Sequence, residues 1–510
     1  MPRYEFSEGT SNKFWEITLE GTGFKTTYGK IGTPGTSTLK DFGDAAKAQK
    51  EYDKLIGEKT KKGYSLVGDD APSPAPAAKK AAPAAAPAAA AKKAAPAKKA
   101  ASGGPTAALD ADPNDAQAWA VYADFLQSNG DPRGELATVQ EQLLANPKDK
   151  NLLSAEKKLL KEHAEMLVGK LLPFIGKSLP SVTARPELGP EARQSSGNED
   201  PIRIRWRAGH IVGATVSYGG YDWSPGGGGE DDEGGGDEGG ERDVADMLAT
   251  LLANPSARFL TDLKIGMPNN PEDGECDTAP VITRLAANDE ACGRIRKLYL
   301  GDIAQEESEV SWIFHGTLAK LLPKMKNLES LTIRGGDFTF GPLDLPNLKE
   351  LVIVTGGLKK KNLDLVCKAK WPALEKLEIW FGSNSYGADT KLKDVQPIFD
   401  GTNFPAVTTL GLKNCEFVNE IAEAISSAKI LPRLKALELS KGVLHTRGVQ
   451  AMVAKKAAFA HLTRIDLSDN FLDASAMKLA STIIPQVRTK PQRNTYGEDT
   501  EDNRYVALGE

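Results

Sequence analysis

A lysine set among glycines near the start of the chain is the first group that could do chemistry. The stretch TTYGKIGTPGTST, residues 26–38, places Lys30 among three glycines and one proline. A phosphate-cradling loop needs glycines that lead into the N-terminus of a helix, with the lysine after them. Here Lys30 precedes the later glycines, and the stretch continues into LKDF. This order favours a turn within a small sheet over a nucleotide-binding loop.

Four charged side chains around a second turn also look catalytic. They are Asp124, Asp131, Arg133 and Glu135, in the segment YADFLQSNGDPRGEL. The pair Asp131-Pro132 is, however, a typical start of a helix, at which Arg133 can pair with a carboxylate. We therefore favour a network that caps a helix and closes a turn.

An acidic, glycine-rich stretch at residues 224–243, SPGGGGEDDEGGGDEGGERD, suggests calcium. Residues 230–243 hold eight acidic side chains and one arginine. The spacing of an EF-hand loop is absent, and nothing fixes the oxygens in one coordination shell. The pattern predicts a solvated, disordered loop with no metal.

The remaining nucleophiles and metal ligands form no recognised motif. The five histidines show no HExxH spacing, the four cysteines show no CxxC spacing, and no GxSxG is present. Scattered cysteines argue against a zinc site and a disulfide framework and fit a reducing interior. We predict no catalytic residues, no cofactor and no enzymatic activity.

The ends and the hydropathy of the chain favour a cytoplasmic protein. The start, MPRYEFSEGTSNKFW, lacks the apolar core of a signal peptide. No run of 18 apolar residues occurs, so we expect no membrane span.

Charge is distributed unevenly along the 510 residues, a length that suggests two to four domains. The first 105 residues carry a formal charge of +6, whereas the rest carry −11. Residues 68–105 consist mainly of Ala, Pro and Lys and cannot bury enough apolar area to offset the entropy of ordering. This stretch predicts a disordered, semi-stiff linker between parts with different partners.

The segment before the linker, residues 1–67, predicts a small antiparallel sheet followed by a helix. KFWEITLEG places Trp15, Ile17 and Leu19 on one face of a strand. The helix begins after DFG and is expected to stop at Gly57, and YSLV forms a last short strand.

This order of elements, with WEI, YGKIG, an Ala-rich helix and EKTKKGY, resembles the WGR domain of poly(ADP-ribose) polymerases and many bacterial proteins. The family's Trp-Gly-Arg is replaced here by Tyr-Gly-Lys, where Tyr can still stack and Lys can still meet a phosphate without the bidentate fork of Arg. Because this region helps contact DNA ends in the polymerases, the resemblance implies a set of nucleic-acid-binding residues: Tyr28, Lys30, Lys59, Lys61 and Lys62.

The next segment predicts consecutive helices. DPNDAQAWAVYADFLQSNGDPRGELATVQ lies within residues 106–145 and resembles the short repeat-companion domain that bacteria place ahead of leucine-rich repeats. The resemblance implies no chemistry of its own.

From about residue 258 the chain repeats an LxxLxL pattern eight times. The apolar residues that open the final LxL are spaced by 20 to 35 residues; they are Leu263, Leu298, Leu331, Leu351, Leu377, Leu410, Leu437 and Ile465. This is the pattern of leucine-rich repeats, whose units stack into a solenoid because one unit cannot bury its own apolar edge. We expect helical returns at residues 314–325, 419–432, 446–459 and 474–487, and a capping strand in RYVAL, residues 504–508.

The residues between and just after each apolar pair should line the concave face of such a solenoid. Interface hot spots favour Trp, Tyr and Arg, so this face predicts a partner-binding site. Its candidate residues are Tyr299, Arg334, Glu378 and Trp380. Any solenoid face displays some side chains, so a purely structural surface remains an alternative.

The predicted fold class is α/β, with a parallel sheet in the solenoid. The predicted domains are a WGR-like domain at 1–67, a linker at 68–105, a helical companion domain at 106–200, strands with the acidic loop and an N-terminal cap at 201–257, the solenoid at 258–490, and a tail or cap at 491–510. The favoured function is a scaffold that binds a protein partner on the solenoid and a second target through the tethered module. The alternative is a protein that binds DNA or RNA through residues 1–105.

Overall fold

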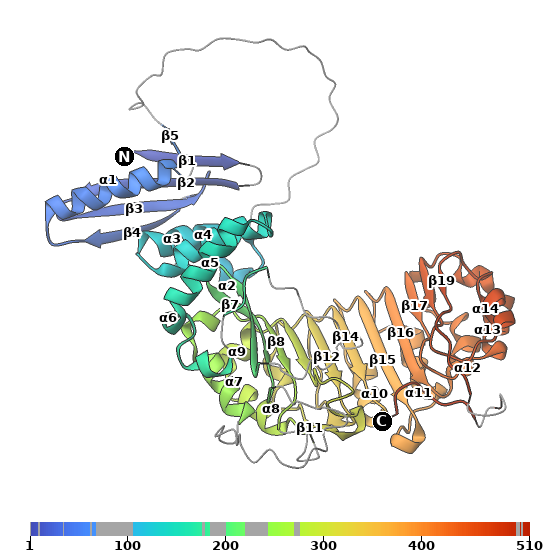
Figure 1. The fold of residues 1–510 in the computed structure, drawn as a ribbon. Coiled ribbons are helices and arrows are strands. Elements are labelled where there is room, and N and C mark those ends of the chain that lie inside the picture. The colour runs from blue at the N-terminus through green and yellow to red at the C-terminus, as the bar shows by residue number, and fades with distance from the viewer. Residues whose placement is uncertain are drawn as a thin grey trace, which may run out of the picture. The chain divides into compact units, whose positions relative to one another are not determined.

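The computed structural model describes residues 2–8, 11–33, 35–61, 64–67, 106–175, 179–183, 200–219, 243–269, 276–495, 500 and 503–509. The chain divides into two compact units, residues 1–159 and 160–510 (Figure 1). The predicted linker at 68–105 lies outside the described residues, as does the acidic loop up to residue 242.

A five-stranded antiparallel sheet with one helix opens the first unit. The strand order is β4-β3-β2-β1-β5. The elements are β1 Arg3–Glu8, β2 Ser11–Glu20, β3 Gly23–Lys30, β4 Thr36–Asp41, α1 Ala45–Lys61 and β5 Ser65–Val67. The alternation in β2 has the predicted effect, since Trp15 and Ile17 are fully buried in the core of this sheet.

The predicted end of the helix at Gly57 is wrong, because α1 continues to Lys61. A Cβ built on Gly57 would meet nothing within 4 Å, so this glycine lies on an open face of the helix. Glycine costs an exposed helix interior only about 1 kcal/mol, which the packing of the last turn offsets. That turn carries Lys59 into the core.

Helices make up the rest of the described part of the first unit. They are α2 Ala107–Ala111, α3 Ala116–Ser128, α4 Pro132–Ala145 and α5 Lys150–Glu162, the last of which crosses the boundary between the units. Asp115 caps α3 by accepting from the main-chain N–H groups of Gln117 and Ala118. Trp119 is fully buried on the inner face of α3.

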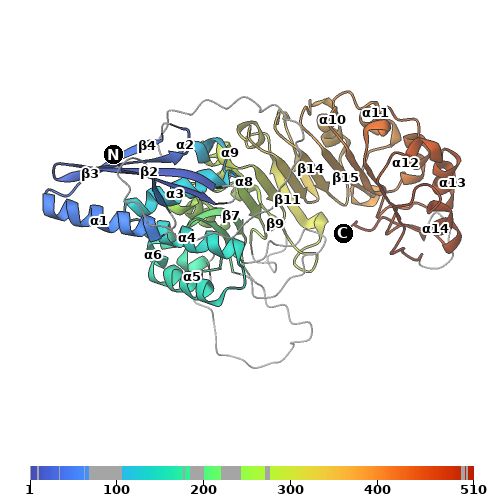
Figure 2. The same ribbon diagram turned by 90° about the horizontal axis from the view of Figure 1, so that it is seen from above.

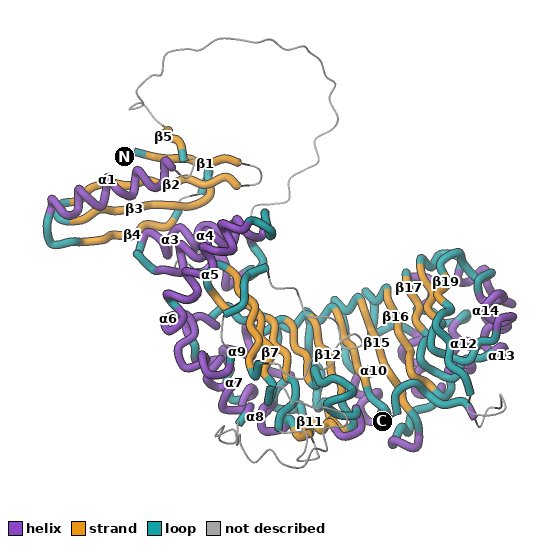
Figure 3. The backbone as a smooth tube through the Cα atoms, in the orientation of Figure 1, coloured by secondary structure: helices purple, strands orange, loops and turns teal. Residues whose placement is uncertain are grey.

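The second unit is built on an 11-stranded sheet in which β6 and β7 form an antiparallel hairpin and all its later strands pair in parallel. Figure 3 shows the strands of this sheet in orange. Its order is β19-β18-β17-β16-β15-β14-β12-β10-β8-β7-β6. The strands are β6 Ile202–Arg207, β7 His210–Val216, β8 Asp262–Ile265, β10 Lys297–Leu300, β12 Ser330–Arg334, β14 Glu350–Val354, β15 Lys376–Gly382, β16 Thr409–Cys415, β17 Ala436–Glu438, β18 Arg464–Asp466 and β19 Val487–Arg488.

The register of the parallel strands follows the alignment of the eight apolar residues. From Leu263 to Ile465, each aligned residue is the direct partner of the aligned residue in the neighbouring strand. None of the eight is more than 2% exposed. A shift of one position would turn these side chains to the opposite face, so their burial fixes the register.

Helices lie in a row along one side of this sheet (Figures 1 and 2). The row comprises α10 Lys360–Lys368, α11 Leu392–Asp400, α12 Val418–Ile425, α13 Thr446–Ala454 and α14 Ala474–Ala480, each of which contacts the next. The last three correspond to predicted helical returns. Near the start of the unit lie α6 Ala164–Val168, α7 Val244–Ala253, α8 Ala279–Ala286 and α9 Asp289–Arg294.

The predicted helix at 314–325 is wrong. Its first half belongs to strand β11, Ile313–Thr317, and only a single 3₁₀ turn, Leu322–Lys324, follows. Strand β11 lies between β9, Cys276–Asp277, and β13, Asp337–Thr339, in a separate parallel sheet. Cross-strand pairing therefore supplies the hydrogen bonds that a helix would have made internally.

Candidate interaction groove

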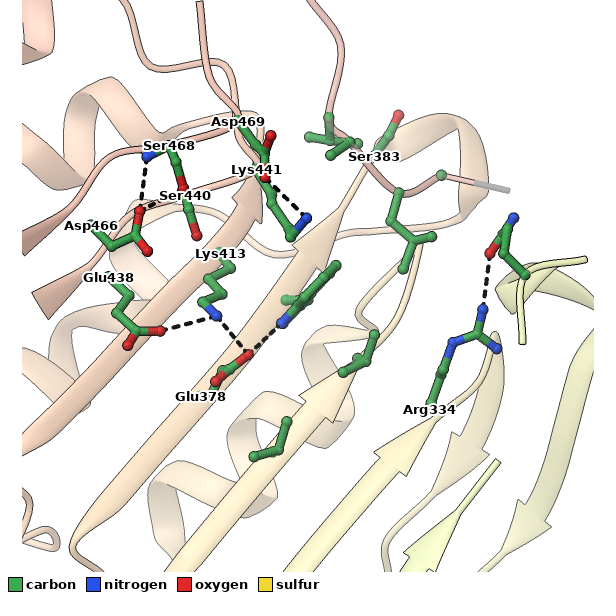
Figure 4. A pocket seen from close by; sticks show the side chains of 18 of the residues that line it. Arg334, Glu378, Ser383, Lys413, Glu438, Ser440, Lys441, Asp466, Ser468 and Asp469 are labelled. Carbon is green, nitrogen blue, oxygen red and sulfur yellow. Dashed lines mark hydrogen bonds and ion pairs between the residues drawn. The ribbon is translucent and has the colours of Figure 1, made fainter. Parts of the chain in front are cut away.

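The outward face of the large sheet holds a groove of about 1390 Å³, which we call the sheet groove. Side chains from β12 and from the strands β14 to β19 form its floor, and residues 505–509 form part of its wall. Figure 4 shows the charged side chains that meet there.

Glu378 is at the centre of the charges in the sheet groove. The Lys413 ammonium group lies 3.0 Å from a carboxylate oxygen of Glu378 and 3.0 Å from one of Glu438 (Figure 4). Lys376 approaches the other oxygen of Glu378 at 3.3 Å. The indole N–H of Trp380 donates to Glu378 at 2.8 Å. The floor is therefore a row of opposite charges that neutralise one another across β15, β16 and β17.

Burial and these neighbours act in opposite directions on the Glu378 carboxyl. Burial by itself raises its pKa, but the positive charges of Lys413 and Lys376 and the hydrogen bond from Trp380 hold the pKa below its ordinary value. The carboxyl is thus ionised at neutral pH although Glu378 is only 6% exposed. Such a group acts as an anchor for cations rather than as a proton donor.

Three of the four predicted partner-binding residues line the sheet groove: Arg334, Glu378 and Trp380. The guanidinium of Arg334 donates to the side-chain oxygen of Gln305 at 2.9 Å. Tyr299 does not line it, although its strand β10 neighbours β12, and its ring faces the ammonium group of Lys264 at 6.0 Å.

A buried histidine forms a hydrogen bond with the main chain of Arg334. His315, on β11, is fully buried and its Nε2 lies 2.9 Å from the Arg334 carbonyl, to which it must donate. Its Nδ1 therefore accepts from the hydroxyl of Thr278 at 2.6 Å. Burial lowers the pKa of His315 to about 4.

Residues 504–509 are the part of the groove that the sequence prediction misplaced. The predicted capping strand is wrong, because the segment is irregular and pairs with no strand. Leu508 packs against Val352, Val354 and Trp380. The signal in the sequence is a short apolar run after a polar stretch, which does not show where that run packs.

The side chain of Asn414, at the end of β16, holds the main chain of this segment. Its Nδ2 donates to the Leu508 carbonyl at 2.5 Å, and its Oδ1 accepts from the Leu508 N–H at 2.8 Å. The Ala507 N–H donates to the Lys441 carbonyl at 2.9 Å. Periodicity gave no indication of Asn414, because its partner lies 94 residues further along the chain.

The predicted nucleic-acid-binding residues are in the first unit. Tyr28 and Lys59 are 3% and 4% exposed. The Tyr28 ring lies 6.0 Å from that of Phe125 on α3, and the Lys59 ammonium lies 4.9 Å from the Tyr64 ring. The side chains of Lys30 and Lys61, and all of Lys62, lie outside the described part of the chain.

Asp124 on α3 joins the helices of the first unit to its sheet. One carboxylate oxygen lies 3.3 Å from the ammonium group of Lys59, and the other accepts from the Tyr64 hydroxyl at 2.7 Å. Lys13 on β2 approaches the same carboxylate at 3.9 Å. These contacts give the Asp124 carboxylate a structural role.

Asp131 and Arg133 form the expected cap. The Asp131 carboxylate accepts from the Arg133 N–H at 2.9 Å, at the start of α4, and pairs with the Arg133 guanidinium at 2.9 Å. Glu135 lies in the first turn of the same helix, where a negative charge is favourable.

The glycine-rich stretch that contains Lys30 forms the turn between β3 and β4, which pair antiparallel. Gly32 and Gly35 have φ angles of +89° and +67°, which favour glycine. A strand follows this turn, since β4 begins at Thr36. The turn prediction is confirmed.

Within the described ranges, no group of three or more His, Cys, Asp or Glu side chains could hold a metal ion. Among the helices that the structure describes, none is both long and apolar enough to cross a membrane.

Residues 3–71 match the WGR domain family. The N-terminal segment is a WGR domain. The match includes the five strands and α1 described above, and it ends before residue 106.

Two curated proteins from Escherichia coli (strain K12) are similar to part of this chain. Protein YehF is 42% identical over 64 residues, which cover 12% of this chain and 23% of that protein. The uncharacterized protein YfeS is 42% identical over 62 residues, covering 12% and 25%. The chain thus spans about a quarter of the length of these bacterial relatives.

A crystal structure of a protein from Bacteroides fragilis is also similar, with a TM-score of 0.48 and 21% identity. The alignment covers 100% of this chain and 99% of that one. At this TM-score the similarity supports no inference about function.

Proposed function

We propose that this chain is a non-enzymatic, cytoplasmic interaction protein that needs no cofactor. The sheet groove binds a protein partner, and the WGR domain binds a second target. The observation that best supports this proposal is the composition of the groove, where Trp380 and Arg334 lie beside a row of paired charges. Tryptophan and arginine are the residue types most favoured at interface hot spots.

We also propose that the large sheet and its row of helices form a leucine-rich-repeat solenoid, with residues 106–200 as its companion domain. The in-register pairing of the eight aligned residues supports this interpretation. In such a solenoid the sheet groove is the concave face, and a stack of similar strands gives a partner a long continuous surface.

A crosslinked pull-down with the full chain tests the partner site. Replacing Trp380→Ala together with Arg334→Ala should remove at least nine-tenths of the recovered partner. The matched control is Trp312→Ala with Arg284→Ala, two side chains that are 52% and 47% exposed and lie outside the groove lining. Equal recovery with both double variants would place the partner elsewhere on the chain.

Binding of nucleic acid by residues 1–105 is the second candidate function. Two observations favour it: the WGR match, and the six lysines with which the linker brings this part of the chain to a charge of +6. Each lysine that neutralises a phosphate releases counterions, so affinity should fall steeply with salt. The two buried candidates, Tyr28 and Lys59, would have to leave their packing against α3 and Asp124 to take part.

The full chain should be titrated with duplex DNA at several salt concentrations. Changing the six linker lysines to glutamine should reduce the slope of log affinity against log salt by about 0.9 for each lost phosphate contact. A chain that binds neither DNA nor RNA at low salt would eliminate this function and leave the protein-partner proposal unaffected.

A further inference from the structure

Residues 504–509 cross the large sheet at the ends of its strands, in the manner of a bound peptide. The Tyr505 ring lies 6.0 Å from that of Phe471, which follows β18. Ala507 bonds to Lys441, which follows β17, and Leu508 bonds to Asn414 at the end of β16. The segment therefore meets one strand end after another, from β18 toward β14.

A repeated turn at the strand ends presents hydrogen-bonding groups to this segment. Asn414, Lys441 and Asp469 each stand four residues after an aligned apolar residue, and their φ angles are +52°, +66° and +53°. In this left-handed conformation the chain turns sharply where the strand ends. The Lys441 carbonyl accepts from the segment there, while Asn414 contributes both an amide donor and an oxygen acceptor. These three bonds involve only the main chain of the segment and do not depend on its side chains.

The side-chain contacts, in contrast, are selective. Leu508 enters an apolar cluster formed by Val352, Val354 and Trp380, all less than a tenth exposed. A branched apolar side chain fits this site, whereas a charged one would lose these apolar contacts.

The next residue, Gly509, passes close to Tyr386 and Gly356. A Cβ built on Gly509 would lie 2.5 Å from the Tyr386 ring. A Cβ on Gly356 would lie 2.1 Å from the Gly509 carbonyl oxygen, so the segment runs close to the protein backbone. The groove thus favours an apolar residue followed by a small one, since a larger residue would require the exposed Tyr386 ring to shift.

We propose that the sheet groove is a peptide-binding site whose ligand is an irregular segment with a branched apolar residue followed by a small residue, and that residues 504–509 occupy it until the corresponding segment of a partner protein displaces them. This inference rests on the proposed function, because it specifies the partner's chemistry. A segment tethered to its own site has an effective concentration of the order of millimolar, so a free ligand must compete with it.

A labelled peptide tests the proposal with the full-length chain. The probe is fluorescein-Arg-Tyr-Val-Ala-Leu-Gly-amide, and fluorescence anisotropy measures its dissociation constant. Leu508→Asp should release the chain's own segment and lower the dissociation constant at least ten-fold relative to the natural chain. Leu508→Ala, which only shortens the side chain, should give a smaller gain and covers the possibility that the aspartate disturbs folding.

Asn414→Gly tests whether the two side-chain hydrogen bonds of Asn414 hold the main chain of the bound segment. Glycine accepts the positive φ at this position but removes both side-chain hydrogen bonds. In the double variant with Leu508→Asp, the dissociation constant of the probe should be at least ten-fold higher than in Leu508→Asp alone. The matched control is Leu144→Asp, an exposed leucine of the first unit, which should bind the probe as the natural chain does.

Equal affinity of the natural chain and the Leu508→Asp variant, or no binding by either, would overturn the proposal, provided that hydrogen exchange in β15 and β16 is unchanged. A dimer of the natural chain that Leu508→Asp abolishes would also overturn it, by placing the segment in a second copy. If the probe fails but the pull-down partner is still lost with Trp380→Ala and Arg334→Ala, the proposed function stands without this inference.

Discussion

The Lys413 ammonium group lies 3.0 Å from the Glu378 carboxylate, and neither residue is more than 8% exposed. Removing one member of a buried ion pair leaves the other without its counter-charge. We therefore expect Glu378→Gln to destabilise the strands around it by about 3 kcal/mol at pH 7. Native-state hydrogen exchange of the β15 and β16 amides measures this loss.

The same substitution has a pH signature. Because the folded state lowers the pKa of Glu378 below its ordinary value of 4.5, its stabilisation is fully present above that pH. It is lost as the pH falls through the lower folded value. The difference between the natural chain and Glu378→Gln should thus shrink in acid. Glu375→Gln, at an exposed position just before β15, should change protection by less than about 0.5 kcal/mol at any pH.

His315 should make the second unit sensitive to mild acid. Its pKa is lowered from 6.5 to about 4 by burial, so between these values the unfolded chain binds a proton that the folded chain does not. Stability should fall by about 3 kcal/mol from pH 6.5 to pH 4 because of this one group. His315→Gln should remove that part of the pH dependence, measured by hydrogen exchange in β11 and β12. An identical pH profile for both proteins would contradict the assignment.

Asp124→Asn should destabilise the first unit. The substitution leaves the Lys59 ammonium without the carboxylate at 3.3 Å and weakens the bond from the Tyr64 hydroxyl. We expect a loss of about 3 kcal/mol, or a melting temperature roughly 5–10 °C lower for this unit, by scanning calorimetry. Asp53→Asn, an exposed carboxylate on α1, is the control and should leave the transition in place. An unshifted transition in Asp124→Asn would show that this carboxylate does not join the helices to the sheet.

Asp131→Ala should cost about 1 kcal/mol, because α4 loses the oxygen that accepts from its Arg133 N–H. Asp131→Ser keeps an N-cap acceptor and should recover most of this loss. Urea denaturation followed by hydrogen exchange in α4 separates the two variants. Equal stability of the two would indicate that the ion pair with Arg133, rather than the cap, carries the effect.

The sequence predicted the register of the large sheet because burial enforces it. Leu263 and the aligned residues that follow are spaced irregularly, yet each pairs with the next, since only that register buries them all. The secondary structure of the segments that connect these strands is less constrained. Phe314 to Met325 carries apolar residues at helical spacing, but its first half pairs as β11 with β9 and β13. Pairing with neighbouring strands decides that this segment forms a strand, and the sequence of the segment alone does not contain that information.

The sequence suggested Arg334, Glu378 and Trp380 as partner-binding residues, because their positions in the LxxLxL pattern place them on one face of the sheet. Position in the repeat could not indicate Leu508. Its environment is made by residues of two strands, β14 and β15, and by Asn414 at the end of a third, β16, which come together only in the folded sheet. Tyr28 and Lys59 show the converse case, since resemblance suggested contact with nucleic acid but α3 and Asp124 bury both side chains.

The four cysteines, Cys276, Cys292, Cys367 and Cys415, are all free, buried and in the second unit. Burial raises the pKa of Cys367 to about 12 and that of Cys292 to about 11, so their reactive thiolates are scarce at neutral pH. A thiol reagent can therefore modify them only when the surrounding structure opens. Cys415 adjoins Asn414. The rate at which a thiol reagent modifies Cys415 therefore reports how often the end of β16 opens, and no cysteine has to be introduced.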